Sequence, residues 1–340
     1  QFLNYCATNG INFGVSPKAE TTSFKLKCFK EMLPISLELL SDVILTPSFP
    51  KDHLDNLKQT YISNCDRIKD YPHYLATRLW KEMIFGKKSN LLGTEGTKST
   101  IRKFSRNQIK KWYENYYNNT KMNLVIVGDF DFNEVLRTCE QLFSSHKKNL
   151  QKNDQNPIYL LTDKKLKQID KNMDQSIINI GGFGCTSNEK QKNTAFHVLA
   201  QIIGGDMNSL LFTELREKRG LAYSVEFDFR SIRTIGYFLV SAIVDKKFES
   251  EAVETIMGVL DNIKRNGISQ EILENTKNFI RGQKLMEEES MMIRAETLSI
   301  LEAIGFGYQF YLDREKRLKK VSIKDIHQIA EEYFKQENYF

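Results

Sequence analysis

The stretch GGDMNSLLFTELREKRGLAYSV, residues 204–225, contains the signals for a helix, a stop and a strand in immediate succession. Residues 208–219 have the pattern of a helix, and Gly220 follows where glycine commonly ends one. From Tyr223 onward apolar and polar side chains alternate, which is the period of a half-buried strand. The stretch therefore predicts a tight helix-to-strand corner in a mixed fold.

The segments around this corner extend the same plan. Residues 176–182 are predicted to form a strand, and residues 193–203 a helix. Residues 235–244 are a nearly continuous apolar run, which is typical of a central strand. A helical stripe then ends at Gly267, and a long helical region is expected over residues 269–304.

The first half of the chain repeats this plan. Strands are predicted at 11–15, 24–28 and 124–127, with helices between the second and third. One helical pattern occurs twice, at a displacement of 217 residues. Its first copy starts with a capping box formed by Ser105 and Gln108. Across the displacement, Ser105, Ile109, Trp112 and Tyr116 correspond to Ser322, Ile326, Ile329 and Tyr333. The same displacement puts the counterpart of the third strand just beyond Phe340, so we expect the C-terminal end to be cut short.

The two repeats predict an α+β fold of two homologous domains, each an antiparallel-rich sheet with helices packed on one face. Residues 1–146 form the predicted N-terminal domain, which we expect to be truncated at its start. Residues 175–340 form the predicted C-terminal domain. Between them, residues 147–174 are largely polar and lack periodicity, which is typical of a linker.

The composition is that of a soluble globular protein with a weak positive balance. The chain has 340 residues, 41% of them apolar and 27% charged, with 49 Lys and Arg against 43 Asp and Glu. These proportions exclude a disordered or fibrous chain. No apolar run approaches the roughly 20 residues of a membrane-spanning helix, and no basic-aromatic motif indicates a nucleic-acid partner. The first residues do not have the pattern of a signal peptide, and the compartment stays open.

Three segments carry a resemblance to a known family. Residues 204–225 resemble the signature of the pitrilysin/insulinase family of zinc peptidases, which includes the mitochondrial processing peptidase. Residues 9–13 and 92–105 are similar to segments of that family's N-terminal domain. The resemblance covers nearly the whole chain, and it implies a fold like that of LuxS and the processing peptidases.

The zinc site that this resemblance implies is missing from the sequence. Family members carry H-x-x-E-H on a helix, with two His ligands, a Glu base and a distal Glu ligand from a later helix. Here none of the five histidines has a His four residues on, and the five cysteines lack the spacing of ligands. The resemblance puts Asn64, a poor zinc ligand, at the distal position, although a shift of two residues would put Asp66 there. We therefore expect no metal on this chain, and zinc on a complementary half.

The resemblance also assigns a substrate-binding pair, Arg216 and Tyr223. In the family, an Arg and a Tyr at this spacing bind the substrate backbone opposite the zinc. A guanidinium offers forked donors to a peptide carbonyl. A phenol can donate to the oxygen that gains charge in a tetrahedral intermediate, which makes Tyr223 the catalytic candidate in a partner's site. The alternative is a surface arginine and a core tyrosine with structural roles only.

Three interpretations of function remain open. In the first, the chain is the non-zinc half of a metalloendopeptidase that degrades or processes unfolded peptides. It would be inactive alone and would pair with a zinc-bearing subunit or domain. In the second, it is a catalytically silent structural paralogue. In the third, it is a fragment of an intact zinc peptidase. The pair Arg216 and Tyr223 favours the first over the second, and Asn64 opposes the third.

Overall fold

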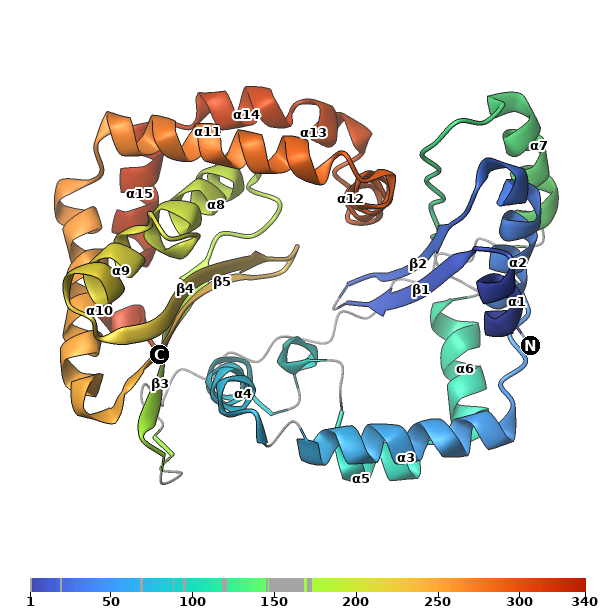
Figure 1. Ribbon diagram of the computed structural model, residues 1–340, viewed down its shortest axis with the longest axis horizontal. Helices are drawn as coiled ribbons and strands as arrows, with labels where there is room; N and C mark the ends of the chain where they lie inside the picture. Colours follow the sequence, from blue (N-terminus) through green and yellow to red (C-terminus); the bar gives the residue numbers. More distant parts are fainter. Residues whose placement is uncertain are drawn as a thin grey trace. The chain divides into compact units, whose positions relative to one another are not determined.

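The computed structural model describes residues 2–18, 20–67, 70–87, 89–93, 96–117, 121–144, 146, 168–169 and 173–340. The chain forms two compact units that interleave along the sequence (Figure 1). Unit 1 comprises Gln1–Ile68, Gly93–Pro157 and Met286–Tyr311, and unit 2 comprises Lys69–Leu92, Ile158–Leu285 and Leu312–Phe340. Most of the predicted linker, 147–174, lies outside the described residues, so that boundary stays a prediction.

Unit 2 is built on a three-stranded antiparallel sheet. Its strands are β3 (Gln175–Gly184), β4 (Ala222–Ser231) and β5 (Gly236–Asp245), in the order β3-β5-β4. The three strands predicted for this half are confirmed, and the apolar run is the central one. Alternate residues of β5 pack into two apolar clusters, with Phe238 and Val240 in one and Leu239 in the other. Because both faces of the strand are covered, its apolar run is continuous.

One face of this sheet is covered by three helices, α8 (Lys190–Gly204), α10 (Glu249–Asn266) and α15 (Ile323–Tyr333). The core between them is rich in phenylalanine. Phe238 stacks on Phe227 at 5.4 Å and meets Phe334 edge-on at 5.2 Å, while Phe196 stacks on Phe229 at 3.9 Å. Such aromatic contacts add to the burial of apolar area, so this core is the firm base of unit 2.

The opposite face of the sheet is contacted by α4 (Pro72–Phe85), which comes from the N-terminal half of the chain. The Trp80 indole N–H donates to the carbonyl of Phe340 at 2.9 Å. Phe340 in turn exchanges two backbone hydrogen bonds with Gly181 of β3, at 2.9 and 3.2 Å. A helix that is distant in sequence is thereby held against β3 and the last residues of the chain.

Unit 1 contains a two-stranded antiparallel sheet, β1 (Asn12–Pro17) and β2 (Thr22–Lys27), as predicted. Its helices are α1 (Phe2–Thr8), α2 (Leu33–Leu45), α3 (Lys51–Arg67), α5 (Lys98–Lys103), α6 (Arg106–Tyr116), α7 (Phe132–Phe143) and α12 (Met291–Ala303). Helix α12 contacts β2, where Lys25 forms an ion pair with Glu296 at 2.6 Å.

The prediction of a strand at 124–127 is wrong. These residues form no ladder within the described part of unit 1, and Leu124 is 44% exposed. The preceding Asn123 instead donates from its side chain to the carbonyl of Ser299 on α12, at 2.9 Å. An apolar run forms a strand only where a neighbouring strand can accept and donate its backbone hydrogen bonds.

The internal repeat is confirmed at the level of helices. Helix α6 starts at 106 and ends at 116, and α15 starts at 323 and ends at 333, each 217 residues later. Both begin with a capping box, at Ser105 with Gln108 and at Ser322 with Asp325. The helices α4 and α12 occupy equivalent places in the repeat, and each belongs to the unit formed mainly by the other half.

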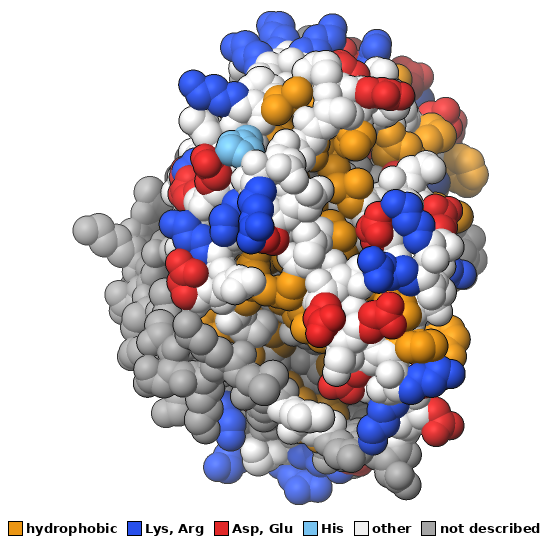
Figure 2. Space-filling view, turned by 90° about the vertical axis from the view of Figure 1, so that its left-hand side faces the viewer, with side chains coloured by type: hydrophobic (Ala, Val, Ile, Leu, Met, Phe, Trp, Pro, Cys, Tyr) orange, Lys and Arg blue, Asp and Glu red, His pale blue; other side chains and the backbone are white. Residues whose placement is uncertain are grey.

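The long helical region predicted over 269–304 is two helices. Helix α11 (Gln270–Glu287) ends before Ser290, whose side chain caps α12. Two short helices, α13 (Tyr308–Leu312) and α14 (Arg314–Lys320), lead to α15. None of the described helices combines the length and the apolar character needed to cross a bilayer. On the face drawn in Figure 2, positive and negative side chains are interspersed.

The close approach of α4 to the sheet leads to a stability prediction. A Cβ on Gly181 would lie 2.2 Å from the carbonyl oxygen of Phe238 and 2.4 Å from Cζ2 of Trp80. We expect Gly181→Ala to lower the free energy of unfolding by about 1–3 kcal/mol, because overpacking forces the backbone to shift. Urea denaturation measures this loss.

Gly258 on α10 is the matched control, since a Cβ there meets no atom within 4 Å. Gly258→Ala should leave stability unchanged or raise it by up to about 1 kcal/mol. If Gly181→Ala were as stable as Gly258→Ala, β3 would not be packed closely between β5 and α4.

Candidate functional site

The helix-to-strand corner of unit 2 consists of a short helix, a π-helical turn, a glycine and the start of a strand. Helix α9 (Leu210–Phe212) passes directly into η4 (Thr213–Lys218), which is a π-helical turn. Gly220 reverses the chain with a φ of 62°, and β4 follows. The predicted helix over 208–219 is thus present, but its second half is wound more widely than an α-helix. Such π-helical turns are rare and are found often at functional sites.

Two backbone hydrogen bonds close the corner. The N–H of Leu221 donates to the carbonyl of Leu215 at 2.7 Å, and the N–H of Gly220 donates to the carbonyl of Arg216 at 3.2 Å. Leu215 and Leu221 are both buried in the phenylalanine-rich core. The corner is therefore fixed by hydrogen bonds on its surface side and by two buried leucines beneath it.

Tyr223 lies at an irregularity in the sheet. Ala222 pairs with Val244 and Ser224 pairs with Ile243, so Tyr223 is the extra residue of a β-bulge. Bulges bend a strand and redirect a side chain, and they are common next to active sites. The side chain of Tyr223 is 58% exposed, which excludes the alternative of a core tyrosine.

Arg216 reaches Tyr223 directly. Its Nη1 donates to the backbone carbonyl of Tyr223 at 2.9 Å. Its guanidinium carbon also lies 5.1 Å from the centre of the Phe212 ring, within the range of a cation–π contact. Arg216 is exposed, so the remaining N–H groups of its guanidinium are open to a ligand.

Arg216 differs from its basic neighbours Lys218 and Arg219, which both form ion pairs. Lys218 pairs with Glu214 at 2.6 Å, and Arg219 pairs with Glu251 at 3.5 Å. Within the described part of the chain, Arg216 has no carboxylate at ion-pair distance. The corner therefore presents one guanidinium without an ion pair, bound to the backbone of a residue whose phenol is exposed, and such a guanidinium suits a carbonyl or another electron-rich acceptor.

The structure brings Arg216 and Tyr223 together at this corner, while their role in binding stays a prediction. The π-helical turn, the bulge and the contact with Phe212 were not predicted from the sequence. The spacing of four residues between Phe212 and Arg216 is a signal that could have indicated their contact. The turn and the bulge leave no comparable pattern.

Comparisons with known proteins identify the family to which this fold belongs. A family model described as "Peptidase M16 inactive domain" matches residues 103–280, and one described as "Insulinase (Peptidase family M16)" matches residues 1–95. The chain belongs to peptidase family M16. This confirms the resemblance that was drawn from residues 204–225, and with it the predicted fold class.

Relatives within family M16 carry names of two kinds. An "uncharacterized zinc protease" of Rickettsia bellii is 26% identical over 330 residues, which cover 96% of this chain and 78% of that protein. "Non-peptidase homolog YmxG" of Helicobacter pylori is 21% identical over 327 residues, which cover 96% and 75%. The fold matches the crystal structure of a peptidase M16 inactive domain from Pseudomonas fluorescens with a TM-score of 0.84 at 17% identity, covering 99% of this chain and 81% of that one.

The described residues do not fit the zinc that family M16 implies. No three His, Cys, Asp or Glu side chains among them gather in a group that could hold a metal. The histidines lie on separate elements and have other neighbours. His73 on α4 contacts the hydroxyl of Ser241 at 3.0 Å, and His197 on α8 meets the ring of Phe229 edge-on.

The predicted distal-ligand position lies on α3. Asn64 is half-buried there and offers an amide where the family has a carboxylate. Asp66, the alternative at this position, forms an ion pair with Lys98. A lysine paired with this carboxylate competes with a metal for Asp66.

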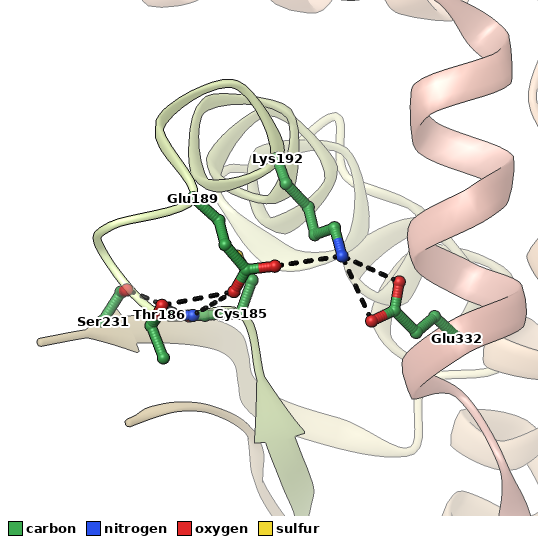
Figure 3. Close-up of polar contacts among 6 residues, drawn as sticks. All are labelled: Cys185, Thr186, Glu189, Lys192, Ser231 and Glu332. Atoms are coloured by element: carbon green, nitrogen blue, oxygen red, sulfur yellow. Dashed lines mark hydrogen bonds and ion pairs between the residues drawn. The ribbon is translucent and has the colours of Figure 1, made fainter. Parts of the chain in front are cut away.

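A second polar cluster of unit 2 joins β3, α8 and α15 (Figure 3). Glu189 accepts from the N–H of Thr186 at 2.9 Å and pairs with Lys192 at 3.1 Å, while Lys192 also pairs with Glu332 at 3.0 Å. Beside it, the hydroxyl of Ser231 donates to the carbonyl of Cys185 at 3.0 Å. Burial raises the pKa of the Cys185 thiol to about 12, which disfavours the reactive thiolate form.

This cluster predicts a pH dependence of stability. Burial works to raise the pKa of Glu189, but hydrogen bonds from Thr186 and Lys192 outweigh it and lower the pKa below its ordinary 4.5. A lowered pKa stabilises the fold above that ordinary value, and the contribution is lost as the pH falls through the folded-state pKa. Glu189→Gln should therefore be less stable than the parent at about pH 7. The loss should be less than ~1 kcal/mol, because the ion pair between Glu189 and Lys192 is partly exposed.

The difference should shrink as the pH falls below the ordinary carboxyl value and through the lowered folded-state pKa, because the carboxylate of the parent then becomes protonated. Urea denaturation at neutral pH and in acid measures it. Glu254→Gln, at an exposed position on α10, should stay within about 0.5 kcal/mol of the parent at both. A difference for Glu189→Gln that stays constant with pH would show that the carboxylate charge is not what stabilises the cluster.

Proposed function

We propose that this chain is the substrate-binding half of an M16 metalloendopeptidase. It supplies Arg216 and Tyr223 to a composite active site, and a zinc-bearing M16 subunit or domain supplies the hydrolytic metal. The observation that carries the proposal is the uncompensated guanidinium of Arg216, bound to the carbonyl of the residue that presents the exposed phenol.

The two side chains are suited to different atoms of a peptide. The free N–H groups of Arg216 can donate to a backbone carbonyl, and a charged donor makes such bonds stronger than a neutral one does. The phenol of Tyr223 can donate to a carbonyl oxygen as it gains negative charge. Neither residue can generate a nucleophile here, so we assign them to binding and charge stabilisation.

An unfolded peptide is the substrate class that this corner supports. An extended chain can pair through its main chain with the edge of a sheet. Strand β4 has β5 on one side only among the described residues, and Tyr223 lies at its start. A peptide that lies along this edge would bring its backbone to Arg216 and Tyr223 without requiring a particular side chain.

The decisive test mixes the chain with the zinc-bearing M16 protein of the same organism and a fluorogenic peptide. Arg216→Ala should lower kcat/KM by about 10- to 100-fold, which corresponds to the loss of one charge-assisted hydrogen bond. Tyr223→Phe removes only the hydroxyl and should lower kcat by up to about 100-fold, if the phenol acts on the transition state.

Lys218→Ala is the matched control for these variants, since Lys218 is exposed on the same turn but pairs with Glu214. It should cleave the peptide within about twofold of the parent. Cleavage by the doubly substituted Arg216→Ala and Tyr223→Phe chain at the parental rate would refute the proposed role.

Zinc itself provides an independent test. Because the described residues offer no ligand group, the chain alone should bind zinc weakly, and added zinc should not raise its melting temperature. Thermal unfolding with zinc and with a chelator measures this. A stoichiometric zinc ion that survives dialysis against the chelator would favour an intact zinc peptidase instead.

A catalytically silent structural paralogue is the second candidate. The relative named "Non-peptidase homolog" and the family description "inactive domain" favour it. It predicts a stable complex with the zinc-bearing protein but no gain in peptide cleavage over that protein alone.

A further inference from the structure

We infer that Phe212 is a positioning residue of this site: its ring holds the guanidinium of Arg216 in the orientation in which the free N–H groups meet the peptide. The inference rests on the proposed function of Arg216 and extends it to a residue that does not touch the substrate.

Two restraints of different kinds act on the guanidinium of Arg216. The hydrogen bond to the Tyr223 carbonyl, at 2.9 Å, fixes one N–H group. The Phe212 ring, 5.1 Å from the guanidinium carbon, lies beside the charged group. A single hydrogen bond still allows the group to turn about its axis, and a ring that attracts the cation limits that turning. Together they fix the direction of the remaining donors.

The ring restrains the arginine without neutralising its charge or accepting its N–H groups in hydrogen bonds. Lys218 and Arg219 are held by the carboxylates of Glu214 and Glu251, which accept their hydrogen bonds and neutralise them. An aromatic ring attracts a cation through its π-electrons and leaves most N–H groups unbonded. A carboxylate in place of Phe212 would compete with a peptide carbonyl for the same donors. The corner therefore uses the one kind of neighbour that orders Arg216 and keeps it available.

The backbone that carries Phe212 is anchored to the core. Phe212 is the last residue of α9, and the side chains of Leu211 before it and Leu215 after it are fully buried. The π-helical turn follows immediately, and such irregular turns persist only where the surrounding packing holds them. Phe212 itself is half-buried, and the guanidinium of Arg216 lies over its ring.

This arrangement lowers the cost of binding. A long exposed arginine loses rotamer freedom when it closes on a ligand. If Phe212 has already removed part of that freedom, less is lost when the peptide arrives. The gain should be seen in peptide binding, so it should change KM more than kcat.

The test compares two variants in the assembled enzyme with a fluorogenic peptide. Phe212→Leu keeps an apolar side chain but has no π-electrons, and it should raise KM about two- to fivefold, the range of an exposed cation–π contact. Phe212→Tyr keeps the ring and should stay within about twofold of the parent. Melting temperatures of the two variants show whether the fold is intact.

A double-mutant cycle separates positioning from packing. In an Arg216→Ala background, Phe212→Leu should have no further effect on KM, because the group that the ring positions is gone. Losses that add in the double variant would show that Phe212 acts through the fold, and the inference would be wrong. The same holds if Phe212→Leu cleaves like the parent while Arg216→Ala is impaired, although the proposed function would then stand. If Arg216→Ala is unimpaired, both fall.

Discussion

The hydrogen bond between the N–H of Leu221 and the carbonyl of Leu215 is the constraint on which the site depends. It closes the loop through Gly220, and the two buried leucines attach that loop to the phenylalanine-rich core of unit 2. Arg216 lies within the closed turn and Tyr223 lies just after it. The packing of the core therefore brings the two residues close together, and the hydrogen bond from Arg216 to the Tyr223 carbonyl joins them.

The two exposed side chains at this corner, Arg216 and Tyr223, are hydrogen-bond donors. A guanidinium and a phenol can orient a carbonyl and stabilise charge on it, but they cannot activate water at neutral pH. The described residues also hold no ligand group for a metal. One family model that matches the chain is described as an inactive domain. Under the proposed function, the hydrolytic metal comes from another subunit or domain.

The features predicted well from sequence are those with local patterns. The alternation in β4, the apolar run of β5 and the capping boxes at Ser105 and Ser322 each depend on neighbouring residues only. The apolar run at 124–127 was misleading, because no local pattern tells whether a pairing strand is present. The π-helical turn and the bulge at Tyr223 result from packing between distant segments, and so they could not be predicted. Arg216 and Tyr223 were found through a family resemblance, since spacing alone would not have singled them out.

The places of α4 and α12 have a consequence for how this protein is made. Each helix completes a unit whose other elements lie far away along the chain, so neither unit is a contiguous stretch of polypeptide. A ribosome that has released only the first half presents β2 with α2 but without α12, which also contacts it. Contacts between residues so distant in sequence form slowly, because a long loop must first be closed. Neither half of the chain can therefore complete its own unit before the other half has been synthesised.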